Sequence, residues 1–345
     1  MPGVLIIAPN WIGDALMAQP LIEAIAARHP GKPVDVLAPA WVTPVCAAMP
    51  GVTGIIPVTL IHGKLQLADR WRFARTLRAK GYELALVLPN SLKSALIPWV
   101  AGIPVRAGYV GEMRVGLLNR RLPKPARSVS MVDRYNALLA LLGNGAADAA
   151  PTLPDPRLDI APDKVRETAA QFGLADGQPF LALCPGAEYG PAKRWPAAHF
   201  ARLAVLAHAR EGAQGRELRI AALGGPGDVA AGQEIADACR EHGVTVANLC
   251  GKTKLDQAIA LLARADMAVC NDSGLMHVTA ALGRPQMAVF GSSDPRHTPP
   301  RSPRATILWQ QLECSPCFAR VCPLGHTRCL TGIAPEKVLA LLPEP

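Results

Sequence analysis

Short apolar runs of strand length alternate with segments of helix length throughout the chain. Four runs lie in each half, at residues 4–8, 34–38, 54–58, 84–88, 180–184, 218–223, 267–270 and 286–290. Continuous apolar runs are typical of strands buried on both faces, and the segments between them would form the covering helices. The pattern predicts an α/β protein with doubly wound parallel sheets.

A proline-rich stretch separates the two halves. Residues 151–157 (PTLPDPR) contain three prolines, which restrict the backbone and remove hydrogen-bond donors. The chain has 345 residues and half of them are apolar, which favours two domains over one or three. We therefore expect domains at residues 1–155 and 156–345, with a cleft at the carboxyl ends of their strands.

The strand predicted at residues 267–270 leads into a helix start that suits an anion. Asp272, Ser273 and Gly274 stand where this helix begins, so free backbone N–H groups and the positive end of the helix dipole converge there. Gly274 would let a phosphate approach the backbone, and Asp272 would cap the helix or accept hydrogen bonds from sugar hydroxyls. His277 could contact the same diphosphate or pack as a structural histidine. The stretch predicts a nucleotide-diphosphate site, with a well-capped loop as the alternative.

The first predicted strand leads into a loop with one glycine and one carboxylate, residues 9–14 (PNWIGD). Asp14 stands near the start of a helix expected over residues 15–28, in which Pro20 predicts a kink or a late start. A helix N-terminus favours the ionised carboxylate, so Asp14 could accept a proton from an attacking hydroxyl as a general base. The alternative is that Asp14 only caps the helix.

A matching loop follows the first strand of the second half, at residues 185–196 (PGAEYGPAKRWP). Gly186 and Gly190 would give it a close approach to a ligand, and Lys193 and Arg194 place two cations near its end. Cations beside a pyrophosphate would neutralise the charge that develops on a departing nucleotide. The alternative is a solvated basic turn anchored by Trp195.

The overall charge is basic, with a formal net charge of +9 and a pI near 9.3. It points to an anionic partner: nucleic acid, a phosphorylated small molecule or a membrane surface. Basic stretches at residues 70–80 and 106–127, the second including Arg114, could face an acidic acceptor or lipid headgroups, or be solvated faces. Nucleic acid is not expected, because no recognition-helix or stacking pattern accompanies the charge. No secretory signal or membrane span is visible, so we expect a cytoplasmic location.

Four cysteines gather near the end of the chain, with a histidine at position 326 between the last two. Cys314 and Cys317 form a C-x-x-C pair, and Cys322 and Cys329 follow. The group could ligate zinc or hold an iron centre, but its spacing matches no standard zinc finger. The alternative is a set of reduced thiols in a tight, proline-rich loop.

Four segments together resemble one known family. They are residues 9–14 (PNWIGD), 185–196 (PGAEYGPAKRWP), 271–277 (NDSGLMH) and 314–317 (CSPC), which look like those of ADP-heptose:lipopolysaccharide heptosyltransferases of glycosyltransferase family nine, over nearly the whole chain. The resemblance implies a GT-B fold, in which an N-terminal acceptor-binding domain and a C-terminal nucleotide-sugar-binding domain, both Rossmann-like, face each other across a cleft. It also implies inverting transfer of L-glycero-D-manno-heptose from ADP-heptose to the first heptose of the lipopolysaccharide inner core, by an enzyme peripheral to the cytoplasmic face of the inner membrane.

The resemblance also implies roles for individual residues. Asp14 matches the general base, Lys193 the lysine that binds pyrophosphate, and Asp272 the contact to the donor heptose. The other substrate-binding positions are Asn10, Gly13, Thr253, Ser273, Gly274 and His277, of which Thr253 falls near the adenine-contacting segment. The chain has no Asp-x-Asp pair, so we expect no metal ion or other cofactor, with cationic groups and helix N-termini in its place.

Two alternatives stay open on sequence grounds. Another GT-B-fold nucleotide-sugar enzyme, such as a sibling heptosyltransferase, an epimerase or a hydrolase, would share the donor motifs. A non-catalytic protein that binds anionic glycolipid or nucleic acid would use only the basic face. Substitution of Asp14 separates a transferase from a pure binder, because only the transferase should lose turnover while it keeps ADP binding.

Overall fold

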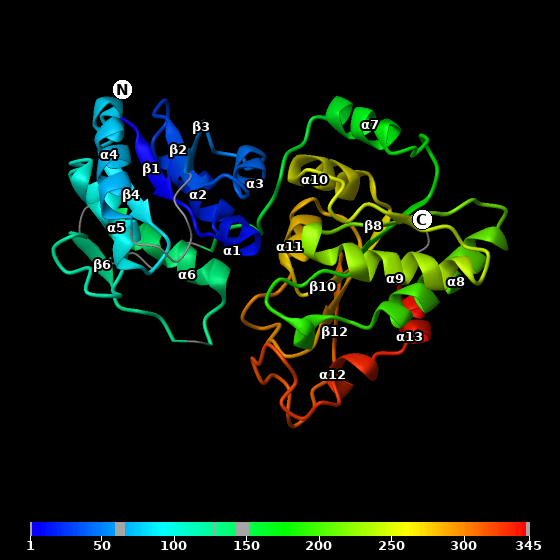
Figure 1. The fold of residues 1–345 in the computed structure, drawn as a ribbon. Helices are drawn as coiled ribbons and strands as arrows, with labels where there is room; N and C mark the ends of the chain where they lie inside the picture. Colours follow the sequence, from blue (N-terminus) through cyan, green and yellow to red (C-terminus); the bar gives the residue numbers. More distant parts are fainter. Residues whose placement is uncertain (1, 59–65, 127, 143–151, 343–345) are drawn as a thin grey trace. The chain divides into compact units, whose positions relative to one another are not determined.

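The computed structural model describes residues 2–58, 66–126, 128–142 and 152–342. The chain divides into two compact units, Met1–Leu158 and Asp159–Pro345, where the sequence predicted a division between residues 155 and 156. Figure 1 shows that each unit has strands at its centre and helices on the outside.

The first unit contains a six-stranded sheet in the order β3-β2-β1-β4-β5-β6, and all its paired strands are parallel. This is the strand order of dinucleotide-binding folds, in which the chain runs from the centre to one edge and then from the centre to the other. The strands are β1 (Val4–Ile7), β2 (Val34–Pro39), β3 (Gly54–Val58), β4 (Leu84–Val87), β5 (Val105–Tyr109) and β6 (Arg120–Leu122). The helices are α1 (Ile12–Met17), α2 (Gln19–Arg28), α3 (Thr43–Ala47), α4 (Leu67–Leu77), α5 (Leu92–Val100) and α6 (Met131–Ala137).

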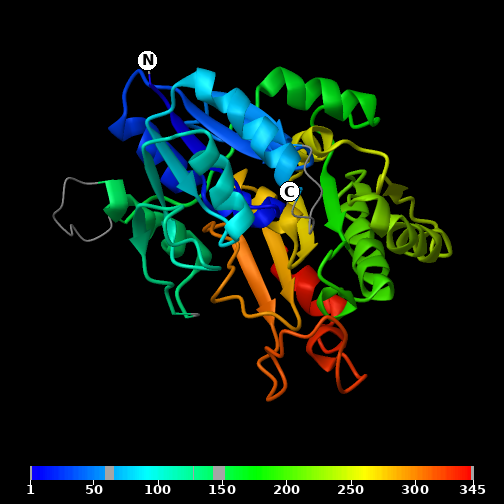
Figure 2. The same ribbon diagram turned by 60° about the vertical axis from the view of Figure 1, so that its left-hand side comes forward.

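The second unit repeats this plan with a six-stranded parallel sheet in the order β12-β11-β10-β7-β8-β9 (Figure 2). Its strands are β7 (Phe180–Cys184), β8 (Arg219–Ala222), β9 (Ala247–Asn248), β10 (Met267–Asn271), β11 (Gln286–Phe290) and β12 (Ala305–Trp309). Its helices are α7 (Pro162–Gln171), α8 (Ala197–Gly212), α9 (Val229–Arg240), α10 (Leu255–Arg264), α11 (Gly274–Ala281), α12 (Arg328–Thr331) and α13 (Pro335–Leu341). The prediction of an α/β protein with two doubly wound parallel sheets is confirmed.

All eight predicted strands are present, and each predicted bound lies within one residue of the observed one. Strands β5, β6, β9 and β12 were missed. Strands β6, β9 and β12 lie at sheet edges, and the apolar run of the inner strand β5 is interrupted by Arg106 and Gly108. The helix expected over residues 15–28 is two helices, α1 and α2, which meet at Ala18. Pro20 stands in the first turn of α2, where its missing N–H costs nothing.

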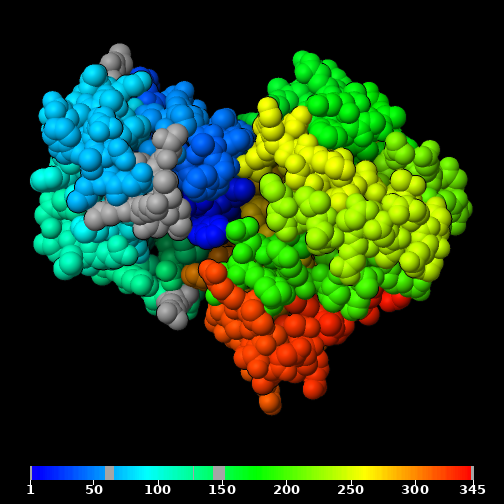
Figure 3. All heavy atoms as spheres, in the orientation of Figure 1, coloured from blue at the N-terminus to red at the C-terminus, as the bar shows by residue number. Residues whose placement is uncertain are grey.

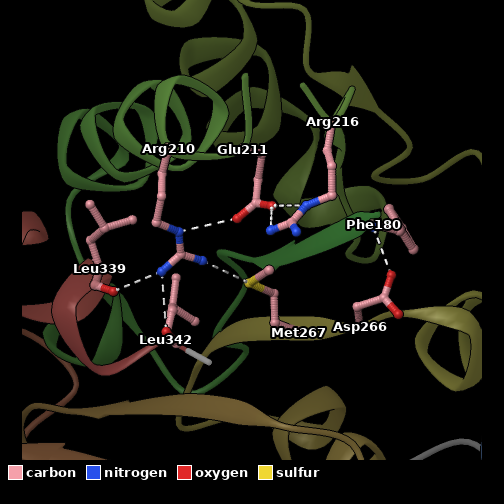
Figure 4. A network of polar contacts seen from close by, with 8 residues as sticks. All are labelled: Phe180, Arg210, Glu211, Arg216, Asp266, Met267, Leu339 and Leu342. Atoms are coloured by element: carbon pink, nitrogen blue, oxygen red, sulfur yellow. Dashed lines mark hydrogen bonds and ion pairs between the residues drawn. The ribbon is translucent and has the colours of Figure 1, made fainter. Parts of the chain in front are cut away.

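A buried charge network holds the end of α8 in the second unit (Figure 4). The Glu211 side chain is fully buried, and its carboxylate accepts hydrogen bonds from Arg216 Nε at 2.8 Å and Arg210 Nε at 3.1 Å. Arg210 Nη1 also donates to the carbonyl of Leu342, just after α13, at 3.2 Å. A buried carboxylate is costly without such partners, so this network ties α13 to α8.

None of the helices in the described part of the chain is both long enough and apolar enough to cross a bilayer.

Candidate functional site

The second unit collects its candidate residues at one edge of its sheet. All its strands run in the same direction, so the loops that follow β7, β10 and β11 open at the same carboxyl edge. Strands β7 and β10 are neighbours at the point where the strand order reverses. Open parallel sheets bind ligands in the crevice at this switch point. The loops that carry Lys193 and Asp272 follow these two strands.

Lys193 and Asp272 form an ion pair at this point. The Lys193 Nζ donates to Asp272 Oδ2 at 2.6 Å, and the Ser293 hydroxyl, from the loop after β11, donates to the same oxygen. Only 18% of the Lys193 side chain and 5% of the Asp272 side chain are exposed. Charges shielded in this way interact more strongly than a surface pair. The ammonium also lies 5.3 Å from the centre of the Tyr189 ring.

The start of α11 leaves backbone donors beside this ion pair. Helix α11 begins at Gly274 after the N-cap residue Ser273, and no side chain caps it. The first N–H groups of a helix have no partner within the helix, so they can bind an anion together with the helix dipole. The expectation that Asp272 caps this helix is wrong, because its carboxylate is engaged by Lys193 and Ser293.

His277 lies in the first turn of α11 and is buried. Its pKa is lowered from 6.5 to about 4: burial is the main cause, Asp272 acts in the opposite direction and raises the pKa, and Lys193 lowers it. The imidazole is therefore neutral at physiological pH, and its charge interactions place it beside the Lys193–Asp272 pair.

Asn271 joins the two switch-point loops directly. Its Oδ1 accepts the backbone N–H of Trp195 at 3.0 Å, and its Nδ2 donates to the carbonyl of Pro185 at 2.6 Å. Asn271 is completely buried, so these bonds fix the end of β10 against both ends of the Lys193 loop.

The carboxylate of Asp228 occupies the space beside Gly186. A Cβ on Gly186 would lie 2.3 Å from a carboxylate oxygen of Asp228, and one on Gly224 would lie 2.8 Å from the same side chain. Asp228 also accepts the N–H of Gly225 at 3.0 Å and lies 3.5 Å from Arg194. The expectation that Gly186 gives a close approach to a ligand is therefore wrong, since the glycine makes room for the carboxylate that links two loops.

The loop between β12 and α12 packs on the loops that follow β7 and β11. The Tyr189 hydroxyl donates to the carbonyl of Phe318 at 2.8 Å, and the Ala192 N–H donates to that of Arg320 at 3.1 Å. The Phe318 N–H in turn donates to the carbonyl of Ser292 at 2.7 Å. This loop thus supports the residues on both sides of Lys193.

The cysteines of this region are free thiols. Burial raises the pKa of Cys329, and the neighbouring Cys314, Cys322 and Cys317 raise it further, so the four lie within electrostatic range of one another. Within the described ranges, no three His, Cys, Asp or Glu residues are grouped so that they could hold a metal ion.

In the first unit the switch point lies between β1 and β4, and Asp14 stands near it. Helix α1 follows the loop after β1 and has Trp11 as its N-cap residue, so Asp14 lies in its first turn as expected. The alternative that Asp14 caps the helix is wrong, because it stands inside α1 and no side chain caps that helix.

A shallow, open recess lies at the same edge of this sheet. Its floor is apolar and comes from the ends of β1, β2 and β3. Its polar lining comes from Asn10, Trp41, Arg70, Lys93 and Ser94. The Trp41 indole donates to the carbonyl of Asn10 at 3.0 Å, which fixes the ring against the Asp14 loop. Among the described residues that line the recess are two cations and no carboxylate.

Arg114 has a structural role. It is 1% exposed and donates to the carbonyl of Pro89 at 2.6 Å and to Asn90 Oδ1 at 2.9 Å. The expectation that Arg114 could face an acidic acceptor is therefore wrong, because it holds the loop after β4 from inside the unit.

The predicted residues fall into three groups. The structure brings Lys193, Asp272, Ser273, Gly274 and His277 together in the second unit. Asn10, Gly13 and Asp14 lie together in the first unit, around the start of α1. Thr253 lies apart, half-buried in the loop after β9, which is three places from β10 in the sheet.

Sequence reasoning missed Ser293, Asp228 and the positioning role of Asn271. Ser293 and Asn271 stand at or just after the ends of predicted strands, so the rule that ligand sites gather at the carboxyl ends of strands could have found them. The contact of Asp228 with Gly186 is visible only in three dimensions, because the two residues are distant in sequence.

The two strand orders and the ion pair at a helix start define a class, the nucleotide-binding α/β enzymes. The family model of glycosyltransferase family 9 (heptosyltransferase) matches residues 70–328. Lipopolysaccharide heptosyltransferase 2 of Escherichia coli (strain K12) is 42% identical over 343 residues, covering 97% of this chain and 96% of that protein. Lipooligosaccharide heptosyltransferase 2 of Haemophilus influenzae is 40% identical over 349 residues, covering 99% and 98%. The structure of E. coli ADP-heptose lps heptosyltransferase II matches with a TM-score of 0.84 and 39% identity, covering 98% of this chain and 96% of that one.

The chain belongs to glycosyltransferase family 9, the heptosyltransferases. It is a glycosyltransferase with the GT-B fold, and the resemblance to heptosyltransferase II is confirmed.

The pKa of His277 makes stability depend on pH. In the unfolded chain His277 takes up a proton near pH 6.5, and in the folded chain only near pH 4. The free energy of unfolding is therefore unaffected by His277 above pH 6.5 and decreases as the pH drops toward 4. The loss should reach about 3 kcal/mol over this window. Urea unfolding at pH 7 and pH 4.5 should show this loss in the wild type and a smaller one in His277→Asn.

The exposed His242 offers the matched control. His242→Asn should leave the pH dependence of the wild type unchanged. Equal pH dependence in the wild type and His277→Asn would contradict the assignment of a buried neutral imidazole.

Proposed function

We propose that this chain transfers L-glycero-D-manno-heptose from ADP-heptose to the first heptose of the lipopolysaccharide inner core, with inversion at the anomeric carbon. The observation that carries the proposal is the convergence of Lys193, Asp272, Ser293 and the start of α11 at the switch point of the second unit. The names of the relatives supply the sugar, the nucleotide and the acceptor class.

The second unit is the proposed nucleotide-sugar domain. The first N–H groups of α11 and the Lys193 ammonium would bind the diphosphate and stabilise the charge that develops on ADP as it departs. The carboxylate of Asp272 would position Lys193 and accept hydrogen bonds from the hydroxyls of the donor heptose. Neutral His277 would add a hydrogen-bonding group next to the diphosphate without a second positive charge. Thr253, in the loop after β9, is the proposed adenine contact.

The first unit is the proposed acceptor domain, with Asp14 as the general base. In the proposed step, Asp14 takes the proton of the acceptor hydroxyl as its oxygen forms a bond to the anomeric carbon and the bond to ADP breaks. The ADP leaves with the electron pair of that bond, so no covalent intermediate forms. Asn10 and Gly13, beside Asp14, are the proposed contacts to the reacting sugars.

The proposed acceptor is anionic and is carried by a lipid. We infer that the cationic recess of the first unit binds an acidic group of the inner core through Arg70 and Lys93. The exposed Trp41 ring would pack on the apolar face of a sugar. The enzyme would act at the cytoplasmic face of the inner membrane, where such an acceptor is anchored.

The decisive experiment measures ADP release from ADP-heptose by the purified protein, with and without an inner-core acceptor that already carries one heptose. Release should depend on the acceptor. Asp14→Asn should slow it by about 100- to 10,000-fold, since the amide cannot accept the proton. Binding of ADP, measured by calorimetry, should be unchanged in this variant.

Acceptor-independent release would point to hydrolysis. Release that is unaffected by Asp14→Asn would remove Asp14 as the base. No release with any heptosylated core would overturn the proposed reaction.

The recess makes a second prediction, on acceptor affinity. Lys93→Gln should raise the KM for a delipidated acceptor by about tenfold, because one charge-assisted hydrogen bond is lost. The KM for ADP-heptose should not change. The matched control is Lys337→Gln, which removes an exposed lysine from α13. An acceptor KM equal to that of the wild type would show that the recess does not bind the acceptor.

A further inference from the structure

Helix α4 has two contrasting faces. Arg70, Ala74 and Leu77 are buried, and Arg70 lines the recess. The neighbouring, exposed face carries Leu67, Trp71, Arg75 and Arg78, spaced four, four and three residues apart, so they form one stripe along α4 and the turn that follows it. The helix thus joins the proposed acceptor site to a second surface.

This second surface is unusually apolar for an exposed helix. Leu67 is 55% exposed, Trp71 is 52% exposed, and Trp99, near the end of α5, is 50% exposed. Helix α5 packs against α4 (Figure 1), and this light-blue part of the chain lies on the outer surface of the first unit (Figure 3). Large exposed aromatic rings on two helices that pack together mark a surface that contacts something apolar.

Two contacts make the surface continuous. The Arg75 guanidinium lies 4.6 Å from the centre of the Trp71 ring. Arg78 donates through Nε and Nη2 to the carbonyl of Val100, at 3.0 Å and 2.9 Å, which places it beside Trp99 at the end of α5. We call these residues the α4–α5 face: Leu67, Trp71, Arg75, Arg78 and Trp99.

The charge around the α4–α5 face is strongly positive. Arg75 and Arg78 belong to it, Arg72 and Lys80 are exposed on the same segment, and Asp69, the acidic residue of α4, lies 3.3 Å from Arg72. Tryptophan rings among arginine and lysine side chains are typical of proteins that bind a bilayer interface. The rings enter the headgroup region and the cations bind lipid phosphates.

We propose that the α4–α5 face docks on an anionic bilayer. Trp71, Trp99 and Leu67 enter the interface, and Arg75 and Arg78 bind the phosphates of anionic lipids. The choice of a membrane over a protein partner rests on the proposed function, in which the acceptor is a glycolipid. In the docked protein the exposed face of α4 contacts lipid, and its buried face presents Arg70 to the acceptor, so one helix brings the recess close to the membrane.

The test is co-sedimentation of the full-length protein with vesicles. Wild type should bind phosphatidylglycerol-containing vesicles and bind pure phosphatidylcholine vesicles far more weakly, and 0.5 M salt, at which the Debye length is about 4 Å, should weaken the binding, as for any charge-driven contact. Arg75→Gln with Arg78→Gln should lower the partition coefficient by about fivefold for each residue. Trp71→Ala with Trp99→Ala should lower it by roughly tenfold.

Two matched controls keep the test specific. Arg202→Gln with Arg240→Gln removes the same charge from exposed positions of the second unit, and Val321→Ala with Leu324→Ala truncates apolar side chains of similar exposure. Both control proteins should bind vesicles as the wild type does. The α4–α5 variants should keep the turnover of the wild type with a delipidated acceptor. The variant that includes Arg78→Gln should have a slightly lower thermal midpoint, because its hydrogen bonds to the Val100 carbonyl are lost.

The outcomes separate this proposal from the proposed function. A wild type that transfers heptose to a delipidated acceptor but does not bind anionic vesicles would overturn the docking surface alone. Vesicle binding that survives both α4–α5 double variants would do the same. A dimer in gel filtration that these variants dissociate, without an effect on vesicle binding, would make the face a self-association surface. Vesicle binding through this face without any heptosyl transfer would overturn the reaction and leave the docking surface intact.

Discussion

The parallel alignment of the strands is the constraint on which both sites depend. In a parallel sheet every strand ends at the same edge, so residues from loops distant in sequence meet there. In the second unit this brings Lys193, after β7, within 2.6 Å of Asp272, after β10. In the first unit it gathers the Asp14 loop and the lining of the recess, which comes from the ends of four strands. The chemistry proposed for each unit depends on this one geometric consequence of the strand order.

Much of this arrangement could be predicted from sequence, because continuous apolar runs mark the central strands and the loops after them carry the motifs. The same rule placed Asp14, Lys193 and Asp272 at the correct edges of their sheets. The roles of single side chains were harder to predict. Asp272 was expected to cap α11 or to bind sugar hydroxyls, and only the structure shows that its carboxylate pairs with Lys193 and Ser293. A role toward a ligand was considered for Gly186 and for the basic stretch that contains Arg114, but both residues serve internal packing. The sequence could not show this, since Asp228 and Pro89, which they contact, are distant in sequence.

The α4 segment shows why composition alone could not separate function from a solvated surface. Its sequence is a run of arginines that includes Trp71 and ends at Gly81. Burial divides that run into Arg70, which lines the recess, and a stripe with Trp71, Arg75 and Arg78 on the outside. In the two proposals, the net charge of +9 includes one cation that faces the acceptor, Arg70, and two that face the lipid, Arg75 and Arg78.

The proposed diphosphate site is tested most directly by titration calorimetry of ADP with the wild type and Lys193→Gln, with Arg202→Gln as the matched charge control. Lys193→Gln should weaken ADP binding by about 10- to 100-fold, since a shielded charge-assisted contact is lost and the Asp272 carboxylate is left without a cation beside the phosphates. Arg202→Gln should bind ADP as the wild type does. Equal ADP affinity in Lys193→Gln and the wild type would show that the Lys193–Asp272 pair is not the diphosphate site.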